Sequence, residues 1–137
     1  MEPQFGHERL DVYVTELEFI RWVALLLKEV KQNDAESTEV RDHLDRASLS
    51  ALLNTAEGNG KRMSRSRSKF FDDARGSATE CAACLDALVV KNATSQDRIV
   101  EGKALLVRIV QMLSRLISLT EKDPRVREEG GDYEDQE

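Results

Sequence analysis

The chain has 137 residues and a mass of 15.5 kDa, which suits a single domain that can bury its own core. Its charged fraction of 34%, with only 7 glycines and 2 prolines, favours helix throughout. A net charge of −6 excludes a protein whose whole surface binds nucleic acid, so such binding would need a local basic patch. No apolar stretch approaches the ~18 residues of a membrane span, residues 1–11 do not resemble a signal peptide, and two cysteines make no disulfide framework. We therefore expect a cytoplasmic protein with no membrane partner.

Hydrophobic periodicity predicts four helices joined by short links. We expect them at about 8–32, 38–57, 65–92 and 95–119, in a bundle spanning 8–120 that follows a frayed segment 1–7 and precedes an acidic, disordered tail 121–137. Short links make consecutive helices antiparallel neighbours, and no strand-like alternation or longer repeat competes with this reading. The predicted fold is an all-α, up-down-up-down four-helix bundle.

The first expected helix has an apolar arc about 180° wide, whereas packing on one neighbouring layer needs only about 100°. The arc runs over Phe19, Val12, Val30, Val23, Leu27, Ile20, Tyr13, Ala24 and Leu17, and its excess width predicts a second contact, with another subunit. Glu16 lies inside the arc, where a carboxylate is unfavourable unless it is paired. Trp22 falls on the polar side, as either a single exposed aromatic or part of an interface.

Helix ends are also marked in the sequence. Gly58 is placed to end the second helix in a left-handed conformation. Thr94 and Asp97 have the spacing of a capping box and predict the start of the fourth helix. Small residues between 76 and 87 keep the third helix thin, which allows a close approach by its neighbours.

The run from Lys61 to Lys69 is the best candidate for a functional surface, because it holds five basic residues in nine and no acid. Cationic side chains, serine hydroxyls and the N–H groups of a helix N-terminus can all contact phosphates. No aromatic residue within the run supplies base stacking. The alternative is a solvated turn that balances acids elsewhere or pairs with the acidic tail. We call this run the basic turn, and its candidate nucleic-acid-binding residues are Lys61, Arg62, Arg65, Arg67 and Lys69.

Other polar residues give no signal of catalysis. Cys81 and Cys84 lie in mid-helix among alanines without a second pair, so they are interpreted as packing residues rather than a redox or zinc motif. His7 and His43 lack the spacing of a metal pair, and no phosphate loop or nucleophile motif is present. We expect no enzyme, no metal and no cofactor. A structural polar network between the second and third helices is expected from Arg46, Asn54, Glu57, Arg75 and Glu80, since buried charges need partners.

Three segments carry a family resemblance. They read Arg46-Ala-Ser-Leu-Ser-Ala51, Leu53-Asn-Thr-Ala-Glu-Gly-Asn-Gly-Lys61, and Phe70-Phe71 followed by Ala74-Arg-Gly-Ser-Ala-Thr-Glu80. Together they resemble the small bacterial four-helix-bundle family first noted as proteins encoded in 23S rRNA intervening sequences, which includes accessory proteins of diversity-generating retroelements. The resemblance covers about residues 7–120, and the opening Leu10-Asp-Val-Tyr13 is also similar to the start of the family's first helix.

The resemblance implies an antiparallel bundle and, as in characterised members, a ring-shaped homopentamer. Retroelement members are understood to bind nucleic acid and a reverse transcriptase through basic surfaces, whereas members from intervening sequences have no settled role. This chain departs from the pattern through its acidic net charge and acidic tail. The leading hypothesis is a non-enzymatic oligomeric module that binds structured RNA, or an RNA–protein assembly, through the basic turn. The alternative is a protein-interaction scaffold with no nucleic-acid role.

Overall fold

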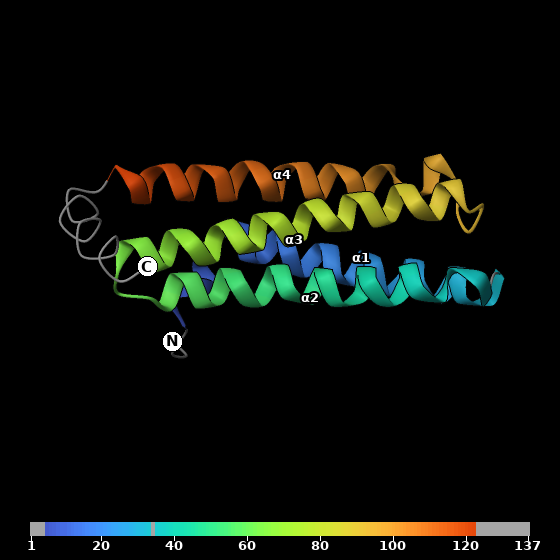
Figure 1. Ribbon diagram of the computed structural model, residues 1–137, viewed down its shortest axis with the longest axis horizontal. Coiled ribbons are helices and arrows are strands. Elements are labelled where there is room, and N and C mark those ends of the chain that lie inside the picture. The colour runs from blue at the N-terminus through green and yellow to red at the C-terminus, as the bar shows by residue number, and fades with distance from the viewer. Residues whose placement is uncertain (1–4, 34, 123–137) are drawn as a thin grey trace.

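The computed structural model describes residues 5–33 and 35–122, and within them it shows an all-α protein with no strand (Figure 1). The four helices form a bundle, as the sequence predicts. They are α1 Asp11–Asn33, α2 Thr38–Gly60, α3 Ser64–Val90 and α4 Gln96–Glu121, with short 3₁₀ helices η1 Gly6–Arg9 and η2 Ala35–Ser37. Each bound lies within three residues of the expected one. The predicted acidic tail falls mainly on 123–137, outside the described residues.

One hydrophobic core joins all four helices, because each helix packs on its neighbours in the chain and α1 also packs on α4. The α3–α4 pair shows how neighbouring helices align. Arg75 on α3 hydrogen-bonds Ser114 on α4, and Asp86 further along α3 pairs with Lys103 further back on α4. Residue numbers therefore rise along α3 as they fall along α4. The largest of the fully buried apolar side chains are Phe71, Leu26, Leu44, Leu85, Leu88, Ile99, Ile109 and Leu113.

Trp22 corrects the prediction for α1, because its side chain is buried in the core and only 6% exposed. The indole packs on Gly102 of α4, where a Cβ atom would lie only 2.3 Å from the ring. It also stacks on Phe19, and the Arg98 guanidinium lies 5.2 Å from the ring centroid. Arg98 in turn donates two hydrogen bonds to Glu29, at 2.8 and 3.1 Å, and so ties α4 to α1. The core-facing arc of α1 is thus rotated towards Trp22 relative to the predicted arc.

Gly58 is the second correction, because α2 continues through it to Gly60 and no glycine of the described residues has a positive φ. Gly58 is buried inside the helix, and a Cβ there would lie 2.8 Å from the ring of Phe71. This glycine therefore makes room for an aromatic side chain of α3 instead of turning the chain.

The connection between α3 and α4 is fixed by two local motifs. Asn92 adopts φ 60°, and its N–H donates to Val89 while that of Ala93 donates to Leu88, which is the pattern of a Schellman cap. Helix α4 then begins with Ser95, whose hydroxyl accepts from the Arg98 N–H at 3.1 Å. The N-cap is therefore Ser95 and not the predicted Thr94, although both lie at the predicted boundary.

Candidate nucleic-acid interface

The basic turn joins the end of α2 to the start of α3, at one end of the bundle (Figure 1). Lys61 is the residue that follows α2, and its N–H closes the helix by donating to the carbonyl of Gly58. Arg62 lies in the link, and α3 begins at Ser64. The remaining basic residues of the turn, Arg65, Arg67 and Lys69, therefore lie in the first two turns of α3.

Two of these cations rest on aromatic rings next to the turn. Lys61 Nζ lies 5.1 Å from the centroid of the Phe70 ring and 3.4 Å from the Glu57 carboxylate. The Arg67 guanidinium lies 5.9 Å from the centroid of Phe71. Cation–π contacts of this kind orient a side chain without neutralising its charge. The aromatic residues that the run itself lacks are thus supplied by the next turn of α3, as supports for the cations.

The cations of the turn differ in their exposure to solvent. Arg62 and Lys69 are exposed, and Arg65 and Arg67 are half-buried. The first turn of α3 contains no acid, and the Met63 side chain at the N-cap accepts no hydrogen bond from it. Cations at a helix N-terminus are repelled by the positive end of the helix dipole. An anion placed there is attracted by the cations and by the dipole. The local electrostatics therefore favour an anionic ligand at this end of the bundle.

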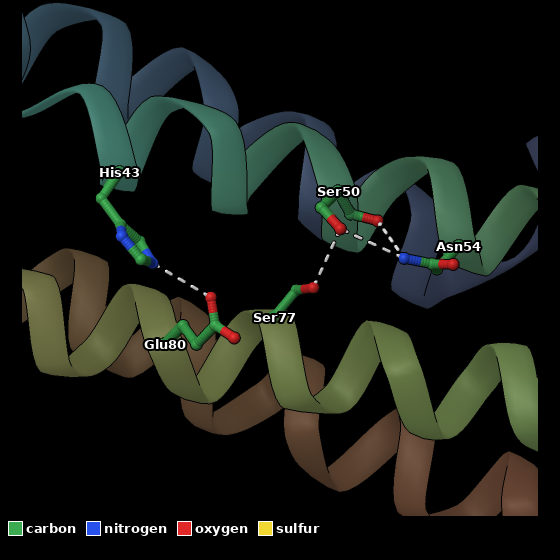
Figure 2. Close-up of polar contacts among 5 residues, drawn as sticks. All are labelled: His43, Ser50, Asn54, Ser77 and Glu80. Atoms are coloured by element: carbon green, nitrogen blue, oxygen red, sulfur yellow. Dashed lines mark hydrogen bonds and ion pairs between the residues drawn. The ribbon is translucent and has the colours of Figure 1, made fainter.

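Among the described residues, the five residues predicted as one polar network make no hydrogen bond or ion pair with one another, and Figure 2 shows two of them, Asn54 and Glu80, with the partners they have instead. Asn54 donates to the backbone and hydroxyl oxygens of Ser50, whose hydroxyl lies 3.0 Å from that of Ser77. Glu80 instead lies 3.2 Å from His43, a contact that no sequence pattern predicts. The Ser50–Ser77 and His43–Glu80 contacts are separate links between α2 and α3.

The other members of the predicted network have partners elsewhere. Arg75 pairs with Asp72 at 2.6 Å and donates to Ser114 at 3.1 Å, so it links α3 to α4. Glu57 pairs with Lys61. Arg46 is exposed and makes no hydrogen bond or ion pair with the described residues.

The groove between α2 and α3 next to the His43–Glu80 pair is open, with a volume of about 310 Å³, and Cys84 lines it. Burial raises the pKa of the Cys84 thiol, and burial raises that of Cys81 to about 12. A thiol with a raised pKa is a poor nucleophile at neutral pH. Across the described part of the chain, no three His, Cys, Asp or Glu side chains are grouped to hold a metal ion.

A buried carboxyl group pairs α1 with α2. Glu16 is 1% exposed, and the Thr55 hydroxyl lies 2.7 Å from its Oε2 atom, while Oε1 has no hydrogen-bond partner among the described residues. Burial raises the pKa of Glu16 to about 8, against a smaller lowering by the Thr55 hydrogen bond. The sequence marked Glu16 as needing a partner, but Thr55 lies 39 positions away and no local pattern identifies it.

One surface of the bundle is apolar and exposed. Leu17 on α1 is 42% exposed, and Leu49 and Leu53 on α2 are 50% and 53% exposed. Together with exposed Ala24 they lie on adjoining helices, within about two helical turns of the Glu16–Thr55 contact. We call these four residues the outer α1–α2 surface. The wide apolar arc of α1 is thus divided between the core and this surface.

None of the helices in the described ranges is long and apolar enough to cross a membrane. Comparison with curated protein sequences returns no match. A family model described as 23S rRNA-intervening sequence protein matches residues 8–115, a range that begins just before α1 and ends within α4. Since the match covers most of the chain and nearly the whole bundle, the protein belongs to the 23S rRNA-intervening sequence protein family.

Proposed function

We propose that the protein is a non-enzymatic, oligomeric module that binds structured RNA, or an RNA–protein assembly, through the basic turn. The observation that carries this proposal is the gathering of five cations and no acid over nine residues at one end of the bundle, in a chain of net charge −6. A charge arrangement so different from the remaining surface suits a partner rich in phosphate. The family description, which refers to 23S rRNA, supports an RNA-related role.

The chemistry of the turn favours recognition of the RNA backbone over recognition of sequence. Guanidinium and ammonium groups pair with phosphate oxygens, and the half-buried hydroxyls of Ser66 and Ser68 lie among them. The rings of Phe70 and Phe71 contact the cations of Lys61 and Arg67, respectively. Phe71 is fully buried, so its ring cannot stack on a base. Phosphate contacts without base contacts give affinity that depends strongly on salt and weakly on sequence.

The proposal includes assembly of an up-down-up-down bundle into a closed homo-oligomeric ring, with five copies as the expected number. It is supported by the outer α1–α2 surface, because large apolar side chains that are half exposed on adjoining helices are typical of an interface. In a ring, each copy contributes one basic turn, and several weak sites act together on one RNA. We place this assembly in the bacterial cytoplasm.

The RNA-binding proposal is tested by measuring the affinity of the full chain for a labelled RNA hairpin across a salt series. The test variant carries Arg62→Glu, Arg67→Glu and Lys69→Glu. The matched control carries Arg21→Glu, Arg46→Glu and Arg108→Glu, which lie in mid-helix, are exposed and change the net charge by the same amount. We expect the wild-type affinity to fall steeply with salt, and the test variant to bind at least tenfold more weakly than the control. Equal affinity of the two variants would overturn the assignment to the basic turn.

The alternative is a scaffold that binds another protein, such as a reverse transcriptase, and has no nucleic-acid role. The outer α1–α2 surface favours it, because an apolar surface of this kind also fits a protein partner. Absence of RNA binding even at low salt would favour this alternative. A partner protein whose binding is lost when Leu49 and Leu53 are replaced by lysine would then identify the surface used.

A further inference from the structure

An exposed aromatic ring lies just before α1. Phe5 is 74% exposed, and among the described residues it is the only exposed side chain of the Phe, Tyr and Trp types. Its ring stacks on that of His7, with the centroids 5.6 Å apart and the planes inclined by 18°. The His7 ring meets Tyr13 edge-on, with the centroids 4.8 Å apart. We call Phe5, His7 and Tyr13 the aromatic cluster, and its outermost ring is open to solvent.

Hydrogen bonds of η1 hold the aromatic cluster in place. The Phe5 N–H donates to the Glu8 carboxylate at 2.7 Å, and the Glu8 N–H donates to the Phe5 carbonyl at 3.1 Å. The N–H of Leu10 donates to the His7 carbonyl at 3.1 Å and so connects η1 to the start of α1. Because the rings are ordered in the free protein, a planar ligand that stacks on Phe5 has little further ordering to impose.

The aromatic cluster lies next to the basic turn. The 3₁₀ helix η1 packs on the end of α2, where a Cβ atom on Gly6 would lie 2.9 Å from the Asn59 Nδ2 atom. Asn59 precedes Lys61 by two residues and Arg62 by three, and three residues of chain span at most about 11 Å. Figure 1 shows the start of the described chain beside the end of α2. Arg9, at the end of η1, is exposed and adds a further cation to this end of the bundle.

The setting of Phe5 decides which kind of partner fits it. A single exposed ring is too small for a protein interface, which buries about 800 Å² on each partner. A ring beside several cations suits a ligand that carries both a flat apolar face and a negative charge, and a nucleotide has both. The bases of a continuous duplex are stacked on one another, whereas those of loops and bulges can turn outwards and stack on aromatic side chains.

We infer that the aromatic cluster stacks an unpaired base of the RNA whose backbone contacts the basic turn, through the open face of Phe5. The inference rests on the proposed function above and narrows its ligand to RNA with an unpaired nucleotide, as opposed to a continuous duplex. Every base has a face that can stack, so this contact selects unpaired structure and is tolerant of sequence.

The test compares two labelled RNAs with equal numbers of phosphates, a hairpin with an unpaired loop and a fully paired duplex. Phe5→Leu keeps an apolar side chain but removes the ring, and Phe5→Trp keeps a ring. The matched control is Leu119→Ala, which shortens an exposed apolar side chain near the end of α4. The affinity of each full-length protein for both RNAs is measured across a salt series. The fluorescence of Phe5→Trp is also followed, and Trp22, the other tryptophan, is buried and gives a constant background.

We expect the wild type, Phe5→Trp and the control to bind the hairpin about tenfold more tightly than the duplex, and Phe5→Leu to bind the two RNAs equally. The salt dependence should be the same in all four proteins, because their phosphate contacts are unchanged. The emission of Phe5→Trp should be quenched by the hairpin and not by the duplex.

The outcomes separate this inference from the proposed function. A hairpin preference that persists in Phe5→Leu would overturn the inference and leave RNA binding by the basic turn intact. An equal loss of affinity for both RNAs in Phe5→Leu would show that Phe5 has a structural role, and would also overturn the inference. Absence of binding to either RNA by every form would contradict the proposed function itself, and the inference with it.

Discussion

The carboxyl group of Glu16 on α1 lies 2.7 Å from the hydroxyl of Thr55 on α2, inside the core. The same hydroxyl lies 3.0 Å from the carbonyl oxygen of Ala51. A hydroxyl has one proton, so both contacts are hydrogen bonds at the same time only if a protonated Glu16 donates to Thr55, which then donates to Ala51. Because burial raises the pKa of Glu16 to about 8, the carboxyl holds that proton at neutral pH.

Replacement of Glu16 by glutamine should therefore remove a pH dependence of stability. In the unfolded chain Glu16 ionises near its ordinary pKa of 4.5, whereas in the folded protein it keeps its proton up to about pH 8. Between these values the unfolded state binds fewer protons, so the free energy of unfolding falls as pH rises, by roughly 3–5 kcal/mol in total. Urea denaturation at pH 5 and pH 8.5 should show this loss in the wild type and not in Glu16→Gln. An equal decrease in the free energy of unfolding of the two proteins would show that Glu16 is not the source of the pH dependence.

Alanine substitutions at two helical glycines should change the free energy of unfolding in opposite directions. At Gly102 a Cβ would lie 2.3 Å from the buried Trp22 ring, so Gly102→Ala should lower the free energy of unfolding by about 1–3 kcal/mol. At Gly76 no heavy atom lies within 4 Å of the added Cβ, so Gly76→Ala should raise it by about 0.5–1 kcal/mol through helix propensity. Denaturation followed by circular dichroism measures both. Stabilisation by Gly102→Ala would show that the indole shifts without loss of packing.

Met63 offers a way to separate stability from RNA binding. It is the N-cap of α3, its side chain makes no capping hydrogen bond, and it is 41% exposed. Both Met63→Ser and Met63→Asp should stabilise the protein by about 1 kcal/mol, since either side chain can accept from the first turn. Only Met63→Asp places an anion in the basic turn, so it should weaken RNA binding several-fold while Met63→Ser leaves it near the wild-type value. Equal RNA affinities for the two variants would contradict phosphate contact at this helix start.

The oligomer is tested by adding charge to the outer α1–α2 surface. If the proposed ring forms through this surface, Leu17→Lys with Leu53→Lys should give monomers, because both side chains are half exposed and a charge there is unfavourable only in an interface. Val100→Lys with Val107→Lys is the matched control on α4, where both valines are exposed to a similar degree. Light scattering after gel filtration gives the mass, and circular dichroism shows whether the helices persist. A wild-type monomer at micromolar concentration would rule out the ring.

The sequence predicted what depends on neighbours along the chain. Periodicity located all four helices and showed that Leu113 faces the core, and the charge run located the basic turn at a helix junction. Prediction from the sequence failed where the environment of a residue depends on residues far away in the chain. Trp22 is buried because Gly102, eighty positions away, leaves a space for it, and Gly58 stays helical because Phe71 fills the space beside it. The contacts of Arg75 with Ser114 and of Glu80 with His43 could not be predicted for the same reason, since each depends on the register between helices.

The fit of Trp22 against Gly102 also has a consequence for how the bundle is aligned lengthwise. If α1 slid along α4 by one helical turn, about 5.4 Å, the indole would meet Arg98 or Leu106 in place of a residue without a side chain. Four helices of similar length and composition have many sliding arrangements that bury comparable apolar area. An aromatic ring that fits at a single position along α4 makes those alternative alignments unfavourable. The lengthwise position of α4 against α1 is therefore the same in every folded copy, because a glycine near the start of α4 allows only one alignment.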